Sequence, residues 1–233
     1  MRQVLSGKTL NEETLTYART LNLDVQCMNF IEVTQIPFNI ELVKNADFDA
    51  IAFTSLNSVK FFASNAECKK LMETKKVFSL SGATAGILLK IGIKPFATAN
   101  DAATLAAMII ESTITKSILH PSGSLKLDVL QQNLSKANIN YHPLLVYKTD
   151  LNETIKTDKN FDAVMFFSPS GVDSFLNVNT WNAKTIACCI GKTTGEAFRN
   201  KQPDANIITP ILPSPESMLK KISNYFQTHK AEA

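Results

Sequence analysis

The chain contains an internal repeat. The segment Phe48–Ser55, with the sequence FDAIAFTS, returns 113 residues later as Phe161–Ser168, with the sequence FDAVMFFS. Two shorter pairs of segments recur in the same order and at nearly the same spacing: Val4–Ser6 with Ile118–His120, and Gly82–Thr84 with Gly191–Thr193. A period of this length is too long for a solenoid and fits a duplicated domain. Two similar lobes predict a ligand site in the cleft between them.

The length and composition describe an ordinary folded protein. A chain of 233 residues has room for two domains of about 100 residues, each with its own core. Its content of 45% hydrophobic and 19% charged residues differs from that of a disordered chain. No apolar run approaches the roughly 20 residues that span a bilayer, and the N-terminus lacks the apolar region of a signal peptide. We therefore expect a cytoplasmic protein that does not bind membranes.

Neither the cysteines nor the charges indicate a metal or a nucleic-acid partner. The four cysteines show no CxxC or Cys/His spacing, so we expect reduced structural thiols and no metal site. The net charge of +3 comes with scattered lysine pairs rather than with a basic cluster and stacking aromatic residues. We interpret these lysines as solvated helix faces and expect no nucleic-acid binding.

Short apolar runs alternate with longer amphipathic stretches. The short runs predict strands at 3–6, 25–33, 50–54, 77–80, 117–119, 144–147, 163–167, 185–190 and 207–209. The amphipathic stretches predict helices at 11–21, 57–72, 83–91, 102–111, 125–137, 171–176, 193–200 and 215–226. Alternating strands and helices, with strands that are continuously apolar, predict an α/β fold whose parallel sheets are covered on both faces.

Two extended, apolar segments, 31–38 and 142–150, are candidates for carrying the chain between the lobes. Cutting the chain at the repeat gives lobes of residues 1–112 and 113–233. If the chain instead crosses at both segments, one lobe is continuous and the other is built from both ends of the chain. The periodicity does not choose between these two partitions.

Small hydroxyl residues and glycines follow four of the predicted strands: Thr54 with Ser55, Ser168 with Ser170, Ser81–Thr84, and Gly191–Thr194. Ligands of open parallel sheets bind beyond the carboxyl ends of the strands. Hydroxyl groups and free backbone N–H groups at helix starts bind anions, so four such turns suit a substrate with several carboxylates or phosphates. The same residue types are the usual helix caps and turn formers, which is the structural alternative.

Motifs of the common catalytic sites are missing. The sequence has no Walker A motif, no G-x-G-x-x-G and no G-x-S-x-G elbow. Among the three histidines, His120 is expected to end a strand, where its ring could face the cleft. Tyr147 lies in a proposed crossing, where its hydroxyl could reach a ligand; the alternative is a packed ring with a solvated tip.

Several of these segments together resemble the uroporphyrinogen-III synthase family. In the family's order they are 53–59 (FTSLNSV), 146–149 (VYKT), 161–172 (FDAVMFFSPSGV), 190–194 (IGKTT) and 214–216 (SPE) before the last predicted helix. Each motif is short, but the ordered set covers essentially the whole chain. The resemblance therefore rests on the set rather than on any one segment.

The resemblance implies two flavodoxin-like α/β lobes with parallel sheets, joined by a two-stranded linker so that the chain crosses twice. It favours a lobe of residues 1–34 plus 149–233 and a continuous lobe of residues 35–148. It also implies a lyase of tetrapyrrole and heme biosynthesis, which uses no metal or organic cofactor. In that reaction the small-molecule substrate hydroxymethylbilane loses its terminal hydroxyl to give an azafulvene. Ring D is then attacked at its substituted carbon through a spiro intermediate and closes, inverted, to uroporphyrinogen III.

Carried onto this chain, the resemblance assigns roles to single residues. Tyr147 would hydrogen-bond the departing hydroxyl. The eight carboxylates of the substrate would be held by hydroxyl and backbone N–H groups: Ser168, Ser170, Gly191, Lys192, Thr193 and Thr194 on one lobe, and Ser55, Asn57 and Thr84 on the other. The work is mainly positioning, because the bilane cyclises unaided to the type I isomer.

The chain departs from the family at three turns. Family members often have an arginine after the first strand, where this chain has Gly7-Lys8. Lys192 stands where a proline is usual, and Pro121–Ser124 replaces a common acidic turn. Lys8 and Lys192 could still supply positive charge to the site.

Two other hypotheses compete with the enzyme. One is a catalytically silent two-lobed protein that binds or senses an anionic small molecule, and the other is a structural homologue whose cleft is empty. For the enzyme we expect a monomer, with transient contact to the preceding enzyme of the pathway.

Overall fold

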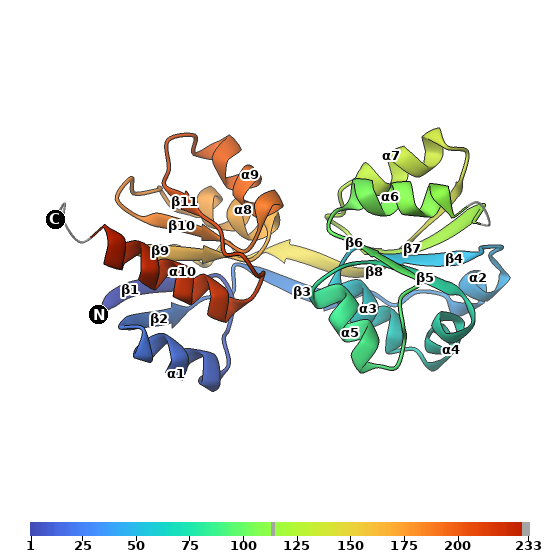
Figure 1. Ribbon diagram of the computed structural model, residues 1–233, viewed down its shortest axis with the longest axis horizontal. Helices are drawn as coiled ribbons and strands as arrows, with labels where there is room; N and C mark the ends of the chain where they lie inside the picture. The colour runs from blue at the N-terminus through green and yellow to red at the C-terminus, as the bar shows by residue number, and fades with distance from the viewer. Residues whose placement is uncertain (113–114, 230–233) are drawn as a thin grey trace. The chain divides into compact units, whose positions relative to one another are not determined.

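The protein consists of two compact units. The computed structural model describes residues 1–112 and 115–229 (Figure 1). The first unit comprises Met1–Glu32 and the chain from Asp150 onward, and the second unit comprises Val33–Thr149. Both ends of the chain thus contribute to one unit, while the other unit is a single continuous stretch.

The first unit is a parallel sheet of five strands in the order β11-β10-β9-β1-β2. Its strands are β1 (Arg2–Ser6), β2 (Leu23–Cys27), β9 (Ala163–Phe166), β10 (Ile186–Cys189) and β11 (Ile207–Ile208). Apolar residues of α1 (Glu12–Thr20) and α10 (Pro215–Thr228) pack on one face. Those of α8 (Pro169–Val178) and α9 (Lys192–Lys201) pack on the other. Because both faces are covered, the central strands β9 and β10 are buried along their whole length.

The second unit has six strands in the order β3-β8-β7-β4-β5-β6, of which β8 to β6 are mutually parallel. The strands are β3 (Ile31–Gln35), β4 (Ala50–Phe53), β5 (Lys76–Leu80), β6 (Ala97–Ala99), β7 (Ser117–Gly123) and β8 (Asn140–Leu151). One core cluster is formed with α2 (Ile40–Asn45), α3 (Leu56–Ala63), α4 (Ala66–Thr74) and α5 (Ala83–Lys90). A second cluster is formed with α6 (Ala102–Glu111) and α7 (Val129–Lys136). The predicted α/β fold with covered parallel sheets is confirmed.

The repeat in the sequence is a repeat of sheet topology and register. Strands β2-β1-β9-β10-β11 of the first unit correspond in order to β8-β7-β4-β5-β6 of the second. Val4 lies opposite Ala163 between β1 and β9. The equivalent residues, Ile118 and Ala50, lie opposite each other between β7 and β4. Equal register at equivalent positions is what duplication of one domain predicts.

The aspartate of each Phe-Asp-Ala motif ties two neighbouring strands together. The Asp162 carboxylate accepts a hydrogen bond from the Gln3 N–H at 2.7 Å, at the start of β1. The Asp49 carboxylate accepts from the N–H groups of Lys116 and Ser117 at 2.7 and 3.0 Å, at the start of β7. The motif is therefore repeated for a structural reason, since it fixes the start of the adjacent strand.

The structure corrects several predicted boundaries. The run 25–33, expected as one strand, is divided between β2 and β3. The stretch 57–72, expected as one helix, is two helices, because the Asn65 side chain accepts hydrogen bonds from the N–H groups of Glu67 and Cys68 and starts α4. Helix α2 and strand β6, which are only six and three residues long, were not predicted.

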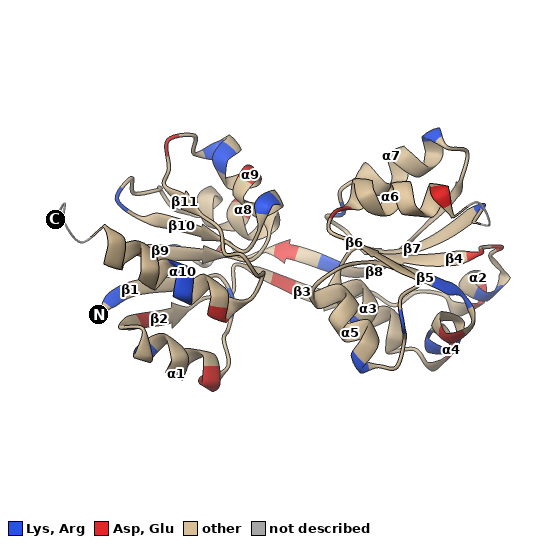
Figure 2. Ribbon diagram, in the orientation of Figure 1, with Lys and Arg blue, Asp and Glu red and all other residues tan. Residues whose placement is uncertain are grey.

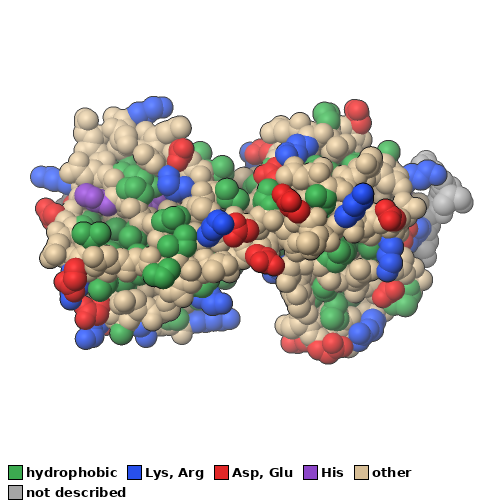
Figure 3. Space-filling view, turned by 180° about the vertical axis from the view of Figure 1, so that it is seen from behind, with side chains coloured by type: hydrophobic (Ala, Val, Ile, Leu, Met, Phe, Trp, Pro, Cys, Tyr) green, Lys and Arg blue, Asp and Glu red, His purple; other side chains and the backbone are tan. Residues whose placement is uncertain are grey.

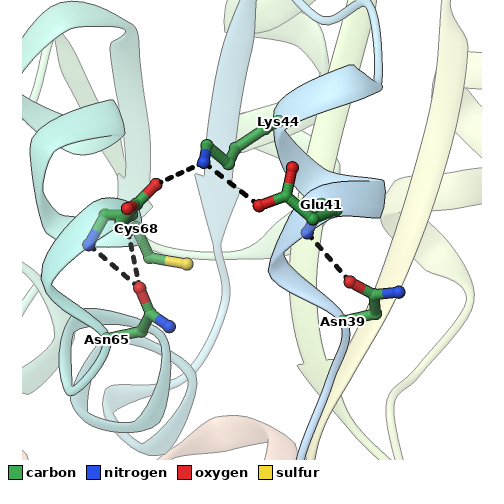
Figure 4. Close-up of polar contacts among 6 residues, drawn as sticks. Asn39, Glu41, Lys44, Asn65 and Cys68 are labelled. Atoms are coloured by element: carbon green, nitrogen blue, oxygen red, sulfur yellow. Dashed lines mark hydrogen bonds and ion pairs between the residues drawn. The ribbon is translucent and has the colours of Figure 1, made fainter.

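Polar contacts at the surface hold the short helix α2. Asn39 caps it by accepting from the Glu41 N–H at 2.9 Å. Lys44 pairs with Glu41 in its own helix and with Glu67 of α4, at 3.2 and 2.8 Å (Figure 4). These contacts raise the pKa of Lys44 and lower that of Glu67, chiefly through the hydrogen bond between them. A helix this short depends on such contacts and on the packing of its buried Val43.

No helix among the described residues is both long and apolar enough to cross a membrane. On the face shown in Figure 3, hydrophobic side chains are dispersed among polar and charged ones. Figure 2 shows basic and acidic residues scattered over both units.

Candidate functional site

The predicted site residues lie at the carboxyl ends of the parallel strands in each unit. In the first unit, β9 is followed by Phe167 and Ser168, and β10 by Ile190 and Gly191. In the second unit, β4 is followed by Thr54 and Ser55. Since these strands are parallel, their carboxyl ends share one edge of each sheet.

Ser168 starts helix α8. Its hydroxyl accepts a hydrogen bond from the Gly171 N–H at 3.1 Å and lies 3.0 Å from the Ser170 hydroxyl. The structure thus brings Ser168 and Ser170 together, both half-buried. Capping, the structural alternative, accounts for the contact of Ser168 with the Gly171 N–H but not for its contact with the Ser170 hydroxyl.

Gly191 is the N-cap residue of helix α9, and no side chain of the described residues caps this helix. The N–H groups of its first turn, which includes Lys192, Thr193 and Thr194, have no partner within the helix. Lys192 and Thr193 are exposed, whereas the Thr194 side chain is only 4% exposed. Of Thr194 it is therefore the backbone N–H, rather than the hydroxyl, that suits an anion.

Lys8 lies beside the Ser168 turn. Its ammonium nitrogen is 4.5 Å from the centroid of the Phe167 ring. Partial burial against the protein lowers the pKa of Lys8, and the attraction of Glu216 opposes this shift. Glu216 itself accepts a hydrogen bond from the Thr14 hydroxyl at 2.6 Å, which lowers the pKa of the carboxyl group. The Lys8 ammonium group therefore lies against the residue that directly precedes Ser168.

Tyr147, Ser55 and Asn57 form a connected group in the second unit. The Tyr147 hydroxyl donates to the Ser55 hydroxyl oxygen at 3.1 Å. That oxygen also accepts from the Asn57 N–H at 3.1 Å, so Ser55 is the N-cap of α3. The Tyr147 ring packs against Phe61 with the ring centroids 5.9 Å apart. The orientation of the phenol is thus fixed both at its tip and along its face.

Thr84 lies in the first turn of α5, the equivalent of α9. This helix also begins at a glycine without a side-chain cap, Gly82, which has a φ of +69°. The Thr84 side chain is 6% exposed, so again the backbone N–H groups are the available donors. The two helices that the repeat relates, α5 and α9, therefore share an uncapped glycine start.

A family model described as uroporphyrinogen-III synthase HemD matches residues 12–220 of the chain. The chain belongs to the uroporphyrinogen-III synthase family. A curated relative, the uroporphyrinogen-III synthase of Schizosaccharomyces pombe, is 27% identical over 168 residues. The alignment covers 66% of this chain and 64% of that relative, slightly less than two thirds of its length.

Solved structures of the same family share the fold. A mutant uroporphyrinogen III synthase of Thermus thermophilus has a TM-score of 0.72 and 13% identity, covering 98% of this chain and 100% of that one. A uroporphyrinogen-III synthetase of Helicobacter pylori has a TM-score of 0.65 and 19% identity, covering 94% and 97%. At these identities the likeness concerns the arrangement of the backbone.

The expectation that His120 ends a strand, where its ring could face a ligand, is wrong. Strand β7 does not end at this residue but continues through Pro121 and Ser122 to Gly123, which pairs with Tyr147 after a bulge. His120 is consequently 1% exposed and sits between β4 and β8. Burial lowers its pKa to about 4, and the nearby Lys126 adds to the shift. The predicted turn at 121–124 is wrong for the same reason.

Gly123 lies against Tyr147 of the candidate site and was not among the residues predicted from the sequence. A Cβ carbon at this position would come within 2.3 Å of the Tyr147 ring. No clear signal for this contact is present in the sequence, because Pro121-Ser122-Gly123-Ser124 has the composition of a turn.

Among the described residues, no group of three or more His, Cys, Asp or Glu side chains could hold a metal ion. All four cysteines are free thiols, and three of them are buried. Burial raises the pKa of Cys68 and of Cys189 to about 12, so both remain protonated near neutral pH. These thiols are part of the cores.

Proposed function

We propose that the protein is a uroporphyrinogen-III synthase, which cyclises hydroxymethylbilane to uroporphyrinogen III with loss of one water. Membership of the family supports the reaction. The observation that carries its assignment to this site is the hydroxyl pair of Tyr147 and Ser55 at the carboxyl edge of the second sheet. The proposal requires no cofactor, and we further propose a cytoplasmic monomer with transient contact to the enzyme that supplies the bilane.

Tyr147 has the geometry of a donor to the departing hydroxyl. Its proton points to Ser55, whose oxygen already accepts a hydrogen bond from the Asn57 N–H. A substrate hydroxyl placed beside the phenol would compete for the same proton. Donation to that oxygen stabilises the charge that develops as its C–O bond breaks. The azafulvene formed is then attacked by ring D, and the enzyme selects the inverted closure by holding the chain of rings in place.

The substrate carboxylates need several anion sites, and both units offer them. In the first unit these are the hydroxyls of Ser168 and Ser170, the start of α9 at Gly191–Thr194 and the cation of Lys8. In the second unit they are Ser55, Asn57 and the start of α5 at Thr84. Uncapped helix starts favour anions because their N–H groups and the helix dipole point at the ligand.

The test is a product analysis. Purified protein is mixed with hydroxymethylbilane freshly made from porphobilinogen, and the products are oxidised and separated as porphyrin isomers. Type III product in proportion to the protein supports the enzyme. Only type I product, at the rate of a protein-free control, would refute it and favour a binding protein without catalysis.

Tyr147→Phe tests the site within the same assay. We expect turnover to fall by roughly a hundredfold, the scale of one acid–base contribution. Tyr17→Phe is the matched control, because Tyr17 packs on the core of the first unit and is not one of the predicted site residues. Turnover of Tyr147→Phe within about twofold of the unmodified enzyme would remove Tyr147 from the mechanism.

A further inference from the structure

His120 is a buried histidine whose two ring nitrogens are both engaged. Nε2 lies 3.0 Å from the Thr54 hydroxyl, and Nδ1 lies 2.5 Å from the Tyr141 hydroxyl. The residue is 1% exposed. A neutral imidazole has one donor and one acceptor, and hydroxyl groups can play either role, so both contacts are satisfied without a charge. A buried polar group whose hydrogen bonds are all made is held rigidly, so His120 is a rigid support for the two residues it contacts, Thr54 and Tyr141.

Thr54 connects this support to the site. It follows β4 directly and precedes Ser55, the N-cap that accepts from Tyr147. The bond from His120 on β7 therefore fixes the residue between the end of the strand and the serine. A change of the Thr54 position would move the Ser55 oxygen relative to the Tyr147 hydroxyl.

The first unit contains an equivalent arrangement built from other residues. The repeat aligns Thr54 with Phe167 and Ser55 with Ser168. Phe167 is contacted by Lys8, which follows β1, the equivalent of β7. In both units, then, a side chain from the neighbouring strand or its turn holds the residue that precedes the capping serine. The residue before the capping serine is thus held in both units, by a hydrogen bond at Thr54 and by a cation–π contact at Phe167.

We propose that His120 is a positioning residue, which holds Thr54 so that Ser55 stays within hydrogen-bonding reach of Tyr147. Only the expected effect of His120 on turnover rests on the proposed function. The geometric part of the inference concerns side chains of one unit and does not depend on that function. His120 itself is buried and acts through Thr54 and Ser55.

Two substitutions divide the contacts of the imidazole. His120→Gln places an amide near the position of Nε2 and keeps the contact to Thr54. His120→Asn places an amide near Nδ1 and keeps the contact to Tyr141 instead. Thr54→Val removes the same bond from the other side without changing His120. His142→Gln is the control, since His142 contacts Ser117 at the far end of β7.

The first readout is fluorine NMR of protein labelled with 3-fluorotyrosine at its four tyrosines, assigned by single Tyr→Phe variants. We expect His120→Asn and Thr54→Val to shift the Tyr147 signal. His120→Gln should shift the Tyr141 signal and leave that of Tyr147 in place. An unchanged Tyr147 signal in both His120→Asn and Thr54→Val overturns the proposal, whether or not the protein proves to be the enzyme.

The second readout is turnover. We expect kcat to fall about tenfold in His120→Asn and Thr54→Val with KM within about twofold, and His120→Gln to restore kcat. In a Tyr147→Phe background, His120→Asn should cause no further loss, because the two residues act in one chain of contacts. Equal losses from His120→Asn in the unmodified protein and in the Tyr147→Phe variant would mean that His120 serves the fold alone. Absence of type III product with the unmodified protein would instead refute the proposed function.

Discussion

The ring of Tyr147 lies directly against Gly123, so close that a Cβ carbon at position 123 would come within 2.3 Å of two ring carbons. Gly123 is the last residue of β7 and pairs with Tyr147 across a bulge. The tyrosine can adopt its position beside Ser55 because this residue has no side chain. The contact links the backbone of one strand to the orientation of the phenol on the next.

Gly123→Ala should therefore act on turnover through Tyr147. The added methyl group forces the ring away from Ser55, so we expect kcat to fall roughly ten- to a hundredfold, as for loss of the hydroxyl itself. Overpacking should also lower the free energy of unfolding by about 1–3 kcal/mol. The isomer assay and a urea titration measure the two effects separately.

Gly86→Ala is the matched control for this glycine substitution. Gly86 lies within α5, and no atom of the described residues stands within 4 Å of its Cβ position. Alanine in a helix interior should raise stability by about 0.5–1 kcal/mol and leave kcat unchanged. Normal turnover of a folded Gly123→Ala protein would show that the ring can relocate without consequence.

Acid should destabilise the protein through His120. Its folded pKa is about 4, below the ordinary value of 6.5, so between these values the unfolded chain binds a proton that the folded chain excludes. The stability that depends on a neutral His120 ring is fully present above pH 6.5 and is lost as the pH falls toward 4. The loss amounts to roughly 3 kcal/mol for this shift of the His120 pKa.

The surroundings of His120 agree with a lowered pKa. Tyr141 on β8 and Thr54 after β4 contact the ring as neutral hydroxyls. Lys126, the cation that adds to the shift, lies 5.7 Å from the centroid of the Tyr141 ring and pairs with Asp128. Urea titrations of the unmodified protein and His120→Gln at pH 7, 6 and 5 measure the difference. The variant should show a shallower decline with pH, and parallel declines would contradict the assignment.

Asp49→Ala should weaken the fold without affecting turnover. The Asp49 carboxylate accepts two backbone hydrogen bonds at the start of β7, at the opposite end of the strand from the site. Water can replace it partly because the residue is exposed, so we expect a loss of about 1 kcal/mol in the free energy of unfolding. Asp47→Ala is the control, since only the Asp47 backbone carbonyl takes part in the contact to Ser117. Equal urea midpoints for the two variants would refute the role of Asp49.

Lys8→Met should weaken substrate binding more than it slows the reaction. Methionine keeps the packing on Phe167 but removes the charge beside the Ser168 turn. We expect KM for the bilane to rise about three- to tenfold with kcat nearly unchanged, and the salt dependence of KM to become weaker. Lys220→Met, on the exposed side of α10, should leave both constants as they are. A fall in kcat alone would point to a different role for Lys8.

The short apolar runs predicted the strands well, because these strands are buried on both faces. Strands β4 and β9 were placed within one residue at each end. The extent of β7 was not predicted, since Pro121-Ser122-Gly123 reads as a turn, and only pairing with the long strand β8 keeps it extended. Helix α2 was missed because six residues are too few for a helical period to show, and because one of its contacts, Lys44 with Glu67, joins residues that are far apart in the sequence.

The polar residues of the candidate site were predicted from strand ends and helix starts, which are local features. Ser55 and Ser168 are caps of the helices that follow their strands, as their sequence positions indicate. The contacts of Tyr147 with Ser55 and Gly123 join separate strands and could not be derived from spacing. His120 was misplaced for the same reason, since the boundary of its strand is decided by its neighbours.

The partition of the chain also sets an order of assembly. Strand β1 pairs with β9, so Val4 meets Ala163 only after the whole second unit, Val33–Thr149, has left the ribosome. The sheet of the second unit is complete once β8 has been made up to Leu151, so this unit can fold during synthesis before β9 is available to pair with β1. Once folded, it holds residues 32 and 150 as the ends of a closed loop, which reduces the entropy that the pairing of β1 and β9 must overcome. Damage to the second unit would thus delay the maturation of the first.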